Sequence, residues 1–279
     1  MATFLRTVFR TPFERSEKQC VSCLSSSKLF IIHPQFLMKA MIFAAGLGTR
    51  LRPLTNDRPK ALVEVNGVSL LEINIRRLIQ FGVDEIIINT HHFAEKIDVF
   101  LAKNDNFGVR IAVSHEAEKP LETGGGLKKA SWFFDDDQPF FICNADILSN
   151  IDLRKMHAAH LKNDAIATYA IQKRDTTRYM LHNTEGSLCG WLNTKTKTVR
   201  MGRRATDLEM CSFSCFHVVS PRFFETTPDG DFFSMIDWYL AICGKHNVMG
   251  WRHDGDIWCD VGKPEALLEA AEIVDKLWI

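Results

Sequence analysis

Short apolar runs alternate with helix-forming segments from residue 40 onward, and this alternation constrains the fold more than any other feature. The runs at 40–45, 85–89 and 140–143 are largely apolar at successive positions, as in strands that are buried on both faces. Between the first two runs, Ser-Leu-Leu-Glu at 69–72 is a capping box that opens a helix, and Gly82 ends it. Strands and helices that alternate in this way predict an α/β fold with a parallel sheet covered by helices on both faces.

The alternation continues along the chain, with one exception. From 179 to 199 the pattern changes to short strands with polar turns, which is typical of antiparallel pairing. We therefore predict a Rossmann-like, mixed but mainly parallel sheet with a small antiparallel insertion. Ligands bind such sheets at the carboxyl ends of the strands, so candidate sites follow residues 45, 113, 143 and 258. The other elements that we expect are strands at 109–113, 165–171 and 213–219 and helices at 94–103, 124–132, 153–161, 232–243 and 265–277.

The net charge of the chain is zero, because 34 lysines and arginines balance 34 aspartates and glutamates. Residues 1–38 nevertheless carry a net charge of +3, and the remainder a net charge of −3. We therefore predict two parts, a poorly ordered extension at 1–38 and a single domain at 39–279. The extension is rich in serine and arginine, as transit-like leaders are, but we favour a start assigned too early, with Met38 as the working initiator.

Composition also excludes some partners. A neutral chain offers no general electrostatic argument for nucleic acid, and no apolar run approaches the roughly 18 residues of a membrane helix. The eight cysteines include one C-x-x-C pair, Cys20 and Cys23, without a second pair at the spacing of a zinc site. The others stand in apolar strings, where free cysteine behaves as a small buried hydrophobe. This usage predicts a reducing, cytoplasmic location.

A glycine-rich loop follows the first predicted strand. Gly46 and Gly48 let backbone N–H groups approach an anion, and Arg50 and Lys60 add positive charge for phosphates. The loop lacks the Lys-Ser/Thr of a P-loop, and Leu51 stands where the dinucleotide fingerprint has its third glycine. The glycines alone would fit an ordinary turn equally well. An ordinary turn does not explain Thr-Arg, Pro-Leu-Thr and Arg-Pro-Lys in order at 49–50, 53–55 and 58–60.

This loop resembles the signature of the sugar-nucleotide nucleotidyltransferases, the pyrophosphorylases that make NDP-sugars, in which G-x-G-T-R-L-x-P-L-T precedes P-K. The resemblance covers residues 39–279 and implies an enzyme with a GT-A-like nucleotidyltransferase fold. It implies that Arg50 holds the triphosphate that leaves as pyrophosphate, and that Lys60 contacts the phosphate undergoing transfer. The nucleotide-binding loop would consist of Ala44, Ala45, Gly46, Leu47, Gly48, Thr49 and Arg50.

A second glycine-rich segment, Leu-Glu-Thr-Gly-Gly-Gly, spans 121–126. Three glycines before a helix let backbone groups meet a planar base and leave the helix N-terminus open to an anion, although a flexible linker has the same composition. The family lines the nucleobase with this segment, so the resemblance adds Glu122, Thr123, Gly124 and Gly125 to the nucleotide site. The segment looks most like that of N-acetylmuramate-1-phosphate uridylyltransferases and of some heptose- or mannose-1-phosphate enzymes.

Two aspartates, Asp146 and Asp260, follow apolar runs. Each alone could equally cap the next helix. The resemblance implies that both are ligands of Mg²⁺, and that Asp146 belongs with Arg50 and Lys60 to the catalytic set. Mg²⁺ commonly uses one or two protein carboxylates together with phosphate oxygens and water, so two aspartates suffice.

The resemblance implies that an NTP and a sugar-1-phosphate react to give an NDP-sugar and pyrophosphate. Our first prediction is uridylyl transfer to an N-acetylmuramate-type sugar-1-phosphate. Alternatives are guanylyl transfer to mannose- or heptose-1-phosphate, cytidylyl transfer to phosphocholine, and a catalytically silent NDP-sugar-binding regulatory paralogue. We expect no nucleic-acid or membrane partner, and a monomer or small homo-oligomer.

Family members often hold the sugar phosphate with the lysine of a Glu-Lys-Pro element. We identify no such element in this sequence. The corresponding region instead has a basic stretch, and a charge run of this kind is ordinarily a solvated face. Its members are Lys195, Lys197, Arg200, Arg203 and Arg204.

Overall fold

A computed structural model describes residues 38–277 of the chain. The predicted N-terminal extension, with Cys20 and Cys23, lies outside the described residues apart from Met38. The first strand, β1 (Met38–Phe43), begins at Met38, one residue before the domain start that we predicted. Within the described residues the six cysteines are free, and all but the half-buried Cys215 are buried. No helix in this part of the chain is long and apolar enough to cross a membrane.

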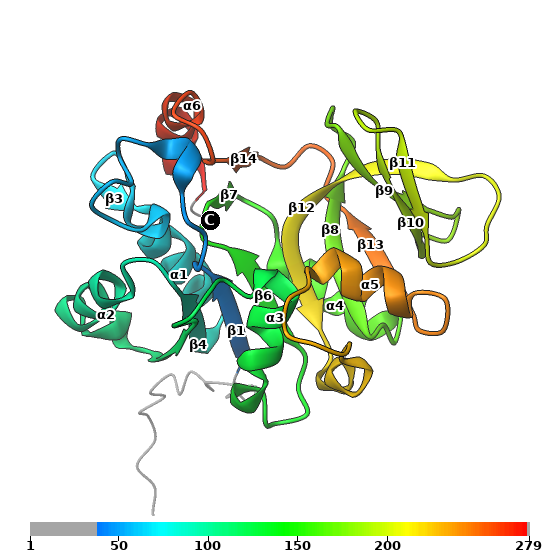
Figure 1. Cartoon of the computed structure of the whole chain (residues 1–279), viewed down its shortest axis with the longest axis horizontal. Helices are drawn as coiled ribbons and strands as arrows, with labels where there is room; N and C mark the ends of the chain where they lie inside the picture. The colour runs from blue at the N-terminus through cyan, green and yellow to red at the C-terminus, as the bar shows by residue number, and fades with distance from the viewer. Residues whose placement is uncertain (1–37, 278–279) are drawn as a thin grey trace, which may run out of the picture. The chain divides into compact units, whose positions relative to one another are not determined.

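The main sheet is mixed, and four parallel strands form one side of it (Figure 1). β1 lies between β4 (Val83–Thr90) and β6 (Phe140–Asn144), and β4 also pairs with β5 (Arg110–His115), all in parallel register. This arrangement confirms the predicted fold class. The carboxyl ends of these four strands meet at one edge, where the sequence predicted the nucleotide site.

The antiparallel part of the sheet is larger than the small insertion that we predicted. β12 (Glu209–Val219) pairs antiparallel with β6 and β9 along one edge and with β8 along the other. β10 and β11 extend the sheet beyond β9, and β13 pairs with β8 in parallel. The sequence analysis missed β13. The bounds of these strands are Ala167–Gln172 (β8), Arg178–His182 (β9), Leu188–Asn193 (β10), Thr198–Met201 (β11) and Val248–Arg252 (β13).

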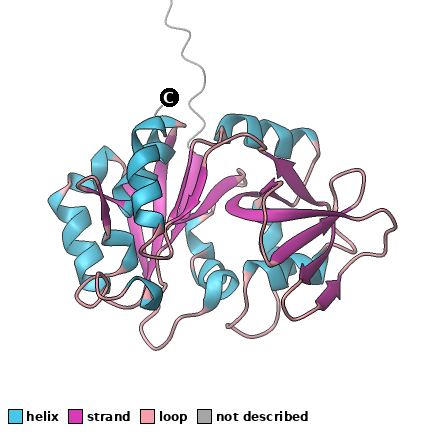
Figure 2. Cartoon of the chain, turned by 90° about the horizontal axis from the view of Figure 1, so that it is seen from above, coloured by secondary structure: helices cyan, strands magenta, loops and turns pink. Residues whose placement is uncertain are grey.

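Helices cover both faces of the sheet, as predicted (Figure 2). Successive residues of β1 point to opposite faces, so Ala40 and Ile42 pack with one set of helices while Met41 packs with the other. The first set contains α1 (Leu70–Gln80), α2 (Ala94–Lys103) and α4 (Leu153–Lys162). The second set contains α3 (Glu122–Lys129) and α5 (Met235–Ile242).

The start of α1 shows how local sequence fixes an element. The Ser69 hydroxyl accepts a hydrogen bond from the backbone N–H of Glu72 at 3.2 Å, as the capping box predicts. Such a cap stabilises a helix by about 1 kcal/mol. Gly82 follows the last turn with a φ of 92°, a left-handed conformation that glycine adopts without a steric penalty.

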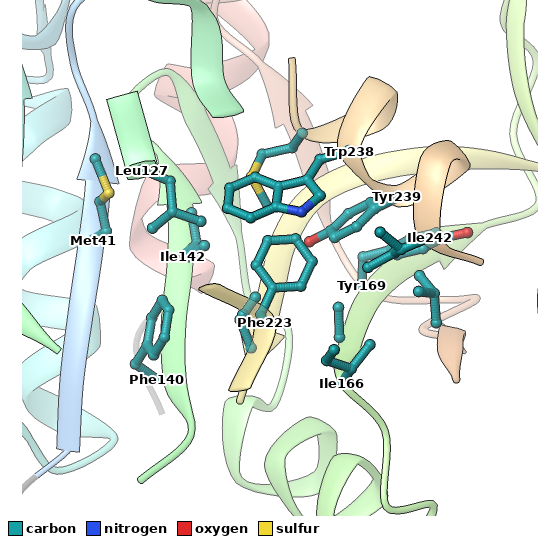
Figure 3. Packing of buried hydrophobic residues seen from close by; sticks show 14 of the residues in the cluster. Met41, Leu127, Phe140, Ile142, Ile166, Tyr169, Phe223, Trp238, Tyr239 and Ile242 are labelled. Atoms are coloured by element: carbon teal, nitrogen blue, oxygen red, sulfur yellow. The ribbon is translucent and has the colours of Figure 1, made fainter. Parts of the chain in front are cut away.

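An aromatic core fills the space between the antiparallel strands and α5 (Figure 3). Trp238 and Tyr239 of α5 pack on Phe223, and the Tyr239 ring stacks on Tyr169 of β8 with centroids 5.4 Å apart. β12 contains an irregularity between Phe213 and His217, within which Cys215 has a φ of 60°. Bulges of this kind redirect side chains and are frequent next to active sites.

Two short strand pairs and the last helix complete the described fold. β2 (Glu64–Val65) pairs with β3 (Val68–Ser69), and β7 (Ile147–Ser149) pairs with β14 (Trp258–Asp260). A third apolar cluster joins them to α6 (Ala266–Ile273). The sequence analysis did not predict these short strands. Short 3₁₀ segments lie at Thr49–Leu51, Lys60–Leu62, Asp105–Gly108, Ser131–Phe133, Pro221–Thr226 and Val274–Lys276.

Candidate functional site

A pocket of about 570 Å³ opens at the carboxyl ends of β1, β4, β5 and β6. Most of the predicted site residues lie on its wall, but Gly124, Gly125 and Asp260 do not line it. The sequence analysis missed several other lining residues, among them Asn89, Glu116, Lys119, Phe232 and Gly262. The predicted residues on the wall are Ala44, Ala45, Gly46, Leu47, Gly48, Thr49, Arg50, Lys60, Glu122, Thr123 and Asp146.

Close contacts between Gly48 and the two motifs that follow it shape the first glycine-rich loop. Gly48 has a φ of 64°, and a side chain there would begin 3.1 Å from both Thr55 and Lys60. The Thr55 hydroxyl donates to the Gly48 carbonyl at 2.8 Å. Pro-Leu-Thr and Arg-Pro-Lys therefore shape the loop, which explains why they accompany the glycines in the sequence.

Gly46 has a different role in the same loop. A side chain at Gly46 would meet nothing within 4 Å, so the surrounding protein does not require glycine there. The hydrogen bonds within residues 38–277 leave the N–H groups of Gly46 and Leu47 unused. Both residues are exposed on the pocket wall. Unused N–H groups on an open wall can receive phosphate oxygens.

Two buried polar residues connect the strand ends beneath this loop. Asn89, at the end of β4, accepts from the Ala44 N–H at 2.8 Å and donates to the Glu116 carboxylate at 2.7 Å. Glu116 also accepts from the Leu121 N–H at 2.7 Å. This network ties the first loop to the second glycine-rich segment. Asn89 lies at the carboxyl end of β4 and Glu116 directly follows β5, and that position is the signal that could have identified them from the sequence.

The second glycine-rich segment differs from the prediction. The glycines at 124–126 lie inside α3, which begins at Glu122, and not before the helix. The N–H groups of Gly124 and Gly125 both donate to the Phe233 carbonyl, at 2.9 and 3.1 Å. The expected anion site at this helix N-terminus is therefore wrong, because a backbone carbonyl already occupies these donors. A side chain at Gly125 would begin 2.0 Å from the Asp231 carbonyl oxygen, so these glycines admit the 231–233 segment.

Phe232 and Lys119 bring a ring and a charge to the pocket from two segments without a predicted role. The side chain of Phe232 is 61% exposed although its neighbour Phe233 is anchored on α3. Lys119 belongs to a Glu118-Lys119-Pro120 tripeptide between β5 and α3. The chain therefore has a Glu-Lys-Pro sequence, which the sequence analysis missed.

The backbone on both sides of Ala145 holds Asp146 at the end of β6. The Ala145 N–H donates to the Phe43 carbonyl at 3.0 Å, and its carbonyl accepts from the Asn74 amide at 3.1 Å. The Asp146 carboxylate forms a partly buried ion pair with Lys60. Asp146 does not cap α4, because Asp152 accepts from the N–H groups of that helix. The charged pair thus joins two motifs that lie far apart in the sequence.

β14 brings Asp260 beside Asp146. Asp260 pairs with Ile147 across the β7–β14 ladder, and the next N–H, that of Val261, donates to the Asp146 carbonyl at 2.9 Å. Asp260 does not cap α6, whose N-cap position is Glu265. A side chain at Gly262 would begin 2.6 Å from the Asp260 carboxylate and 2.8 Å from the Arg50 guanidinium, so glycine lets these groups approach.

The two aspartates form an electrostatic site that fits a divalent cation. Burial, and then the neighbouring Asp146 carboxylate, raise the pKa of Asp260 above its ordinary value. One oxygen of Asp260, Oδ1, is buried without a hydrogen-bond partner. A buried, unpartnered carboxylate oxygen beside a second carboxylate is a suitable ligand for Mg²⁺. Residues 38–277 contain no cluster of three or more side chains typical of a metal site, and Mg²⁺ does not need one.

The basic stretch after β10 does not reach the pocket. Arg200 pairs with Asp237 at 2.7 Å, and Arg203 donates to the carbonyls of Cys243 and His246. None of its five members lines the pocket described above. This placement favours the solvated face over a phosphate site.

Comparison with known proteins identifies the family. The sequence profile described as "Nucleotidyl transferase" matches residues 39–185. The chain belongs to this family. The nucleotidyltransferase is 34% identical over 237 residues to the N-acetylmuramate alpha-1-phosphate uridylyltransferase of Caulobacter vibrioides, which covers 83% of the chain and 94% of the relative. It is 31% identical over 233 residues to the enzyme of that name from Neisseria meningitidis serogroup B, over 84% of the chain and 96% of the relative.

Solved structures share the fold of the nucleotidyltransferase at lower sequence identity. HddC from Yersinia pseudotuberculosis, in complex with GMP-PN, superposes with a TM-score of 0.67 at 22% identity, over 85% of this chain and 99% of HddC. A UDP-glucose pyrophosphorylase in complex with UDP-glucose gives 0.66 at 16% identity, over 86% and 99%. Family membership and fold together confirm the enzyme class predicted from the first loop.

Proposed function

We propose that the enzyme transfers a uridylyl group from UTP to an N-acetylmuramate-type sugar-1-phosphate and releases pyrophosphate. As a sugar-1-phosphate nucleotidyltransferase, it needs a site for each substrate. One observation carries the choice of substrates. The likeness to two N-acetylmuramate alpha-1-phosphate uridylyltransferases extends over 94% and 96% of their lengths, and so through the antiparallel part of the sheet. The mannose-1-phosphate guanyltransferase of Gibberella zeae is 35% identical, but over only 41% of its length.

The pocket supplies the nucleotide site in this proposal. The unused N–H groups of Gly46 and Leu47 receive phosphate oxygens, and Arg50 holds the part of the triphosphate that leaves. The base lies toward Glu122 and Thr123, above the Asn89–Glu116 network that joins both loops. Binding energy from base and triphosphate thereby aligns the α-phosphate for attack.

Lys60 acts at the phosphate that undergoes transfer. Its ammonium group already faces the end of β6 through the ion pair with Asp146. When a triphosphate enters, the same group can stabilise the negative charge that develops on the α-phosphate. Asp146 and Asp260 would hold Mg²⁺, which supplies neutralisation of phosphate charge as the bond to pyrophosphate breaks.

The reaction needs no general base from the protein. A phosphate monoester has a second pKa of about 6, so the acceptor is mostly a dianion at neutral pH. One of its oxygens attacks the α-phosphorus of UTP and forms the new P–O bond. The bond from that phosphorus to the bridging oxygen breaks, and pyrophosphate leaves with the electron pair. Alignment and charge stabilisation are therefore the main tasks of this chain.

A screen of pyrophosphate release tests the proposal. The four common NTPs are combined with N-acetylmuramate 1-phosphate, N-acetylglucosamine 1-phosphate, glucose 1-phosphate and mannose 1-phosphate in the presence of Mg²⁺. We expect the highest kcat/KM for UTP with N-acetylmuramate 1-phosphate. A preference for GTP with mannose 1-phosphate would support the guanylyl alternative instead. Tight NDP-sugar binding without turnover of any pair would support the silent paralogue.

A further inference from the structure

A cation without an ion pair lies beside the two catalytic carboxylates. Arg174 follows β8 by two residues and is half-buried. Its Nη2 donates to the Phe213 carbonyl at 3.1 Å, and its Nε is buried without an acceptor. Within residues 38–277, no hydrogen bond or ion pair engages its Nη1. Two of the three guanidinium nitrogens therefore have no acceptor in the described protein.

The orientation of this guanidinium is fixed by an aromatic ring. Arg174 lies over the ring of Trp258, 3.6 Å from its centroid, and the Trp258 indole N–H donates to the Ser214 carbonyl at 3.0 Å. Trp258 stands two residues before Asp260 on β14. The stack thus holds the planar fork of donors against β14, the strand that contains Asp260. An arginine ordered in advance loses less conformational freedom when it binds a phosphate.

The electrostatics of neighbouring groups support the same location. Burial lowers the pKa of Arg174, and the Asp260 carboxylate partly offsets this effect. Burial raises the pKa of the Cys215 thiol most, the charges of Asp146 and Asp260 raise it further, and those of Arg174 and Lys60 lower it. All four charged groups are therefore close enough to Cys215 to act on it. A partly buried cation that lacks a protein anion is costly unless a ligand supplies the charge.

Arg174 does not line the pocket described above, but its charge acts on Asp260, and its position favours the acceptor over the NTP. Arg50 and Lys60 reach the centre from the parallel strands, whereas Arg174 comes from β8 on the antiparallel side. The acceptor phosphate has to approach the same α-phosphate from a side that the triphosphate leaves free. Lys119 is the alternative cation on the pocket wall, but its charge acts on the pKa of Asp231 and is not among the charges that shift the pKa of Asp260.

We propose that Arg174 binds the phosphate of the sugar-1-phosphate acceptor, an assignment that rests on the proposed function. The guanidinium replaces the lysine that other family members take from a Glu-Lys-Pro element. Arginine is suited to this task because its fork can bind two phosphate oxygens at once. The assignment concerns substrate binding, and Arg174 takes no proton in the reaction.

Steady-state rates with UTP, N-acetylmuramate 1-phosphate and Mg²⁺ test this assignment. We expect Arg174→Gln to raise the KM for the sugar phosphate at least tenfold while the KM for UTP stays within twofold. Arg174→Lys keeps the charge without the fork and should recover part of the loss. Arg200→Gln is the matched control, because it removes a cation outside the pocket and should leave this KM unchanged. Lys119→Gln tests the alternative cation on the pocket wall.

Three results would overturn the assignment. One is an unchanged KM for the sugar phosphate in Arg174→Gln, with normal turnover by the wild type. Another is an equal rise of both KM values with a lower melting temperature, because a merely structural role would produce it. The third is a selective rise in Lys119→Gln instead. If the wild type turns over no sugar-1-phosphate at all, the proposed function fails first and takes the assignment with it.

Discussion

The parallel and antiparallel parts of the sheet carry different kinds of information. The parallel part presents polar groups at one edge, and many of its pocket residues are close in sequence, from Ala44 to Lys60. The antiparallel part buries an aromatic core and contributes two isolated residues. Arg174 lies near Asp260, and Phe232 lies on the pocket wall. A triphosphate imposes the same contacts wherever it binds, so it leaves a local sequence motif. An acceptor sugar can be held by scattered side chains, which leave none.

The largest expected effect tests whether the two parts meet at one metal. Asp146 comes from the end of a parallel strand, and Asp260 from the segment that follows the antiparallel strands. We expect Asp146→Asn and Asp260→Asn each to lower kcat about 10³-fold, since each removes a proposed ligand of the Mg²⁺ that would neutralise phosphate charge in the transition state. Removal of Mg²⁺ with EDTA should abolish activity reversibly.

Asp152→Asn is the control for these variants, because asparagine can still cap α4 and the residue lies outside the pocket. Circular dichroism should show that all three variants are folded. Full activity in Asp146→Asn or Asp260→Asn would contradict the metal assignment of that residue. A large loss of activity in only one of the two variants would mean that only one of the two aspartates is a metal ligand.

Two glycines, one from each glycine-rich segment, allow a sharper comparison. Gly125→Ala inserts a methyl group 2.0 Å from the Asp231 carbonyl, so we expect it to destabilise the fold by about 1–3 kcal/mol. Gly46→Ala meets nothing within 4 Å and should leave the melting temperature unchanged while it raises the KM for UTP. Denaturant unfolding and initial rates measure both effects. Equal destabilisation by the two variants would contradict the distinction between a packing glycine and a ligand-facing one.

Phe232 tests whether the antiparallel part also contributes to nucleotide binding. Base–aromatic stacking contributes about 1–3 kcal/mol by alanine substitution, so Phe232→Ala should raise the KM for UTP about tenfold. Trp132→Ala is the matched control, since Trp132 is 59% exposed but does not line the pocket. Phe232→Tyr keeps the ring and should retain affinity. A selective rise of the KM for the sugar phosphate would assign Phe232 to the acceptor.

The smallest expected effect is a pH dependence of stability that arises from a buried histidine of the antiparallel part. Burial lowers the pKa of His217 to about 3, and the imidazole is 2.6 Å from the Tyr239 hydroxyl in the aromatic core. The ordinary pKa of histidine is 6.5, so between these values the unfolded chain binds more protons than the folded chain. The contribution of neutral His217 to the free energy of unfolding is then fully present above pH 6.5 and is lost as the pH drops toward 3. The slope should be on the order of 1 kcal/mol per pH unit.

Melting curves at pH 7.5 and 5.5 measure this slope for the wild type and for His217→Gln. The slope of stability against pH should be smaller in the variant, by about the one proton that His217 binds on unfolding. Changing the exposed His92 to Gln should leave the slope unaltered. Burial also lowers the pKa of His160, His182 and His253 to about 4, and all three contact the antiparallel strands or their flanking segments. An unchanged slope in His217→Gln would contradict a neutral, buried His217.

The sequence predicted features that depend on short stretches of chain. The Ser69 capping box, the first loop and the carboxyl-end rule needed only residues that are close together or a single strand. The start of α3 could not be predicted in the same way, because the carbonyl that orders Gly124 and Gly125 belongs to Phe233, far along the chain. The antiparallel part was underestimated for a related reason, since β13 is a strand only through its pairing with β8.

The candidate site divides along the same line. Arg50, Lys60 and Asp146 were predicted because the family motifs surround them, and all three line the pocket. Glu116 was missed although it follows a strand whose end was under consideration, and Asn89 lies at the end of a strand that was not; neither stands in a motif. Phe232 and Arg174 depend on packing against distant elements, on α3 and on Trp258, and a linear pattern contains no record of that packing.

The β7–β14 ladder has a consequence for how the enzyme is made. Asp260 reaches Asp146 only because Trp258–Asp260 pairs with Ile147–Ser149, and that pairing requires the chain beyond β13. During synthesis, a nascent chain that has emerged as far as β13 can close its parallel sheet and expose the triphosphate loop, but it lacks the second carboxylate. Under the proposed assignment of Asp260 to Mg²⁺, a chain of this length cannot complete the metal site. The proposed metal site is complete only once the three residues of β14 have been synthesised and have paired with β7.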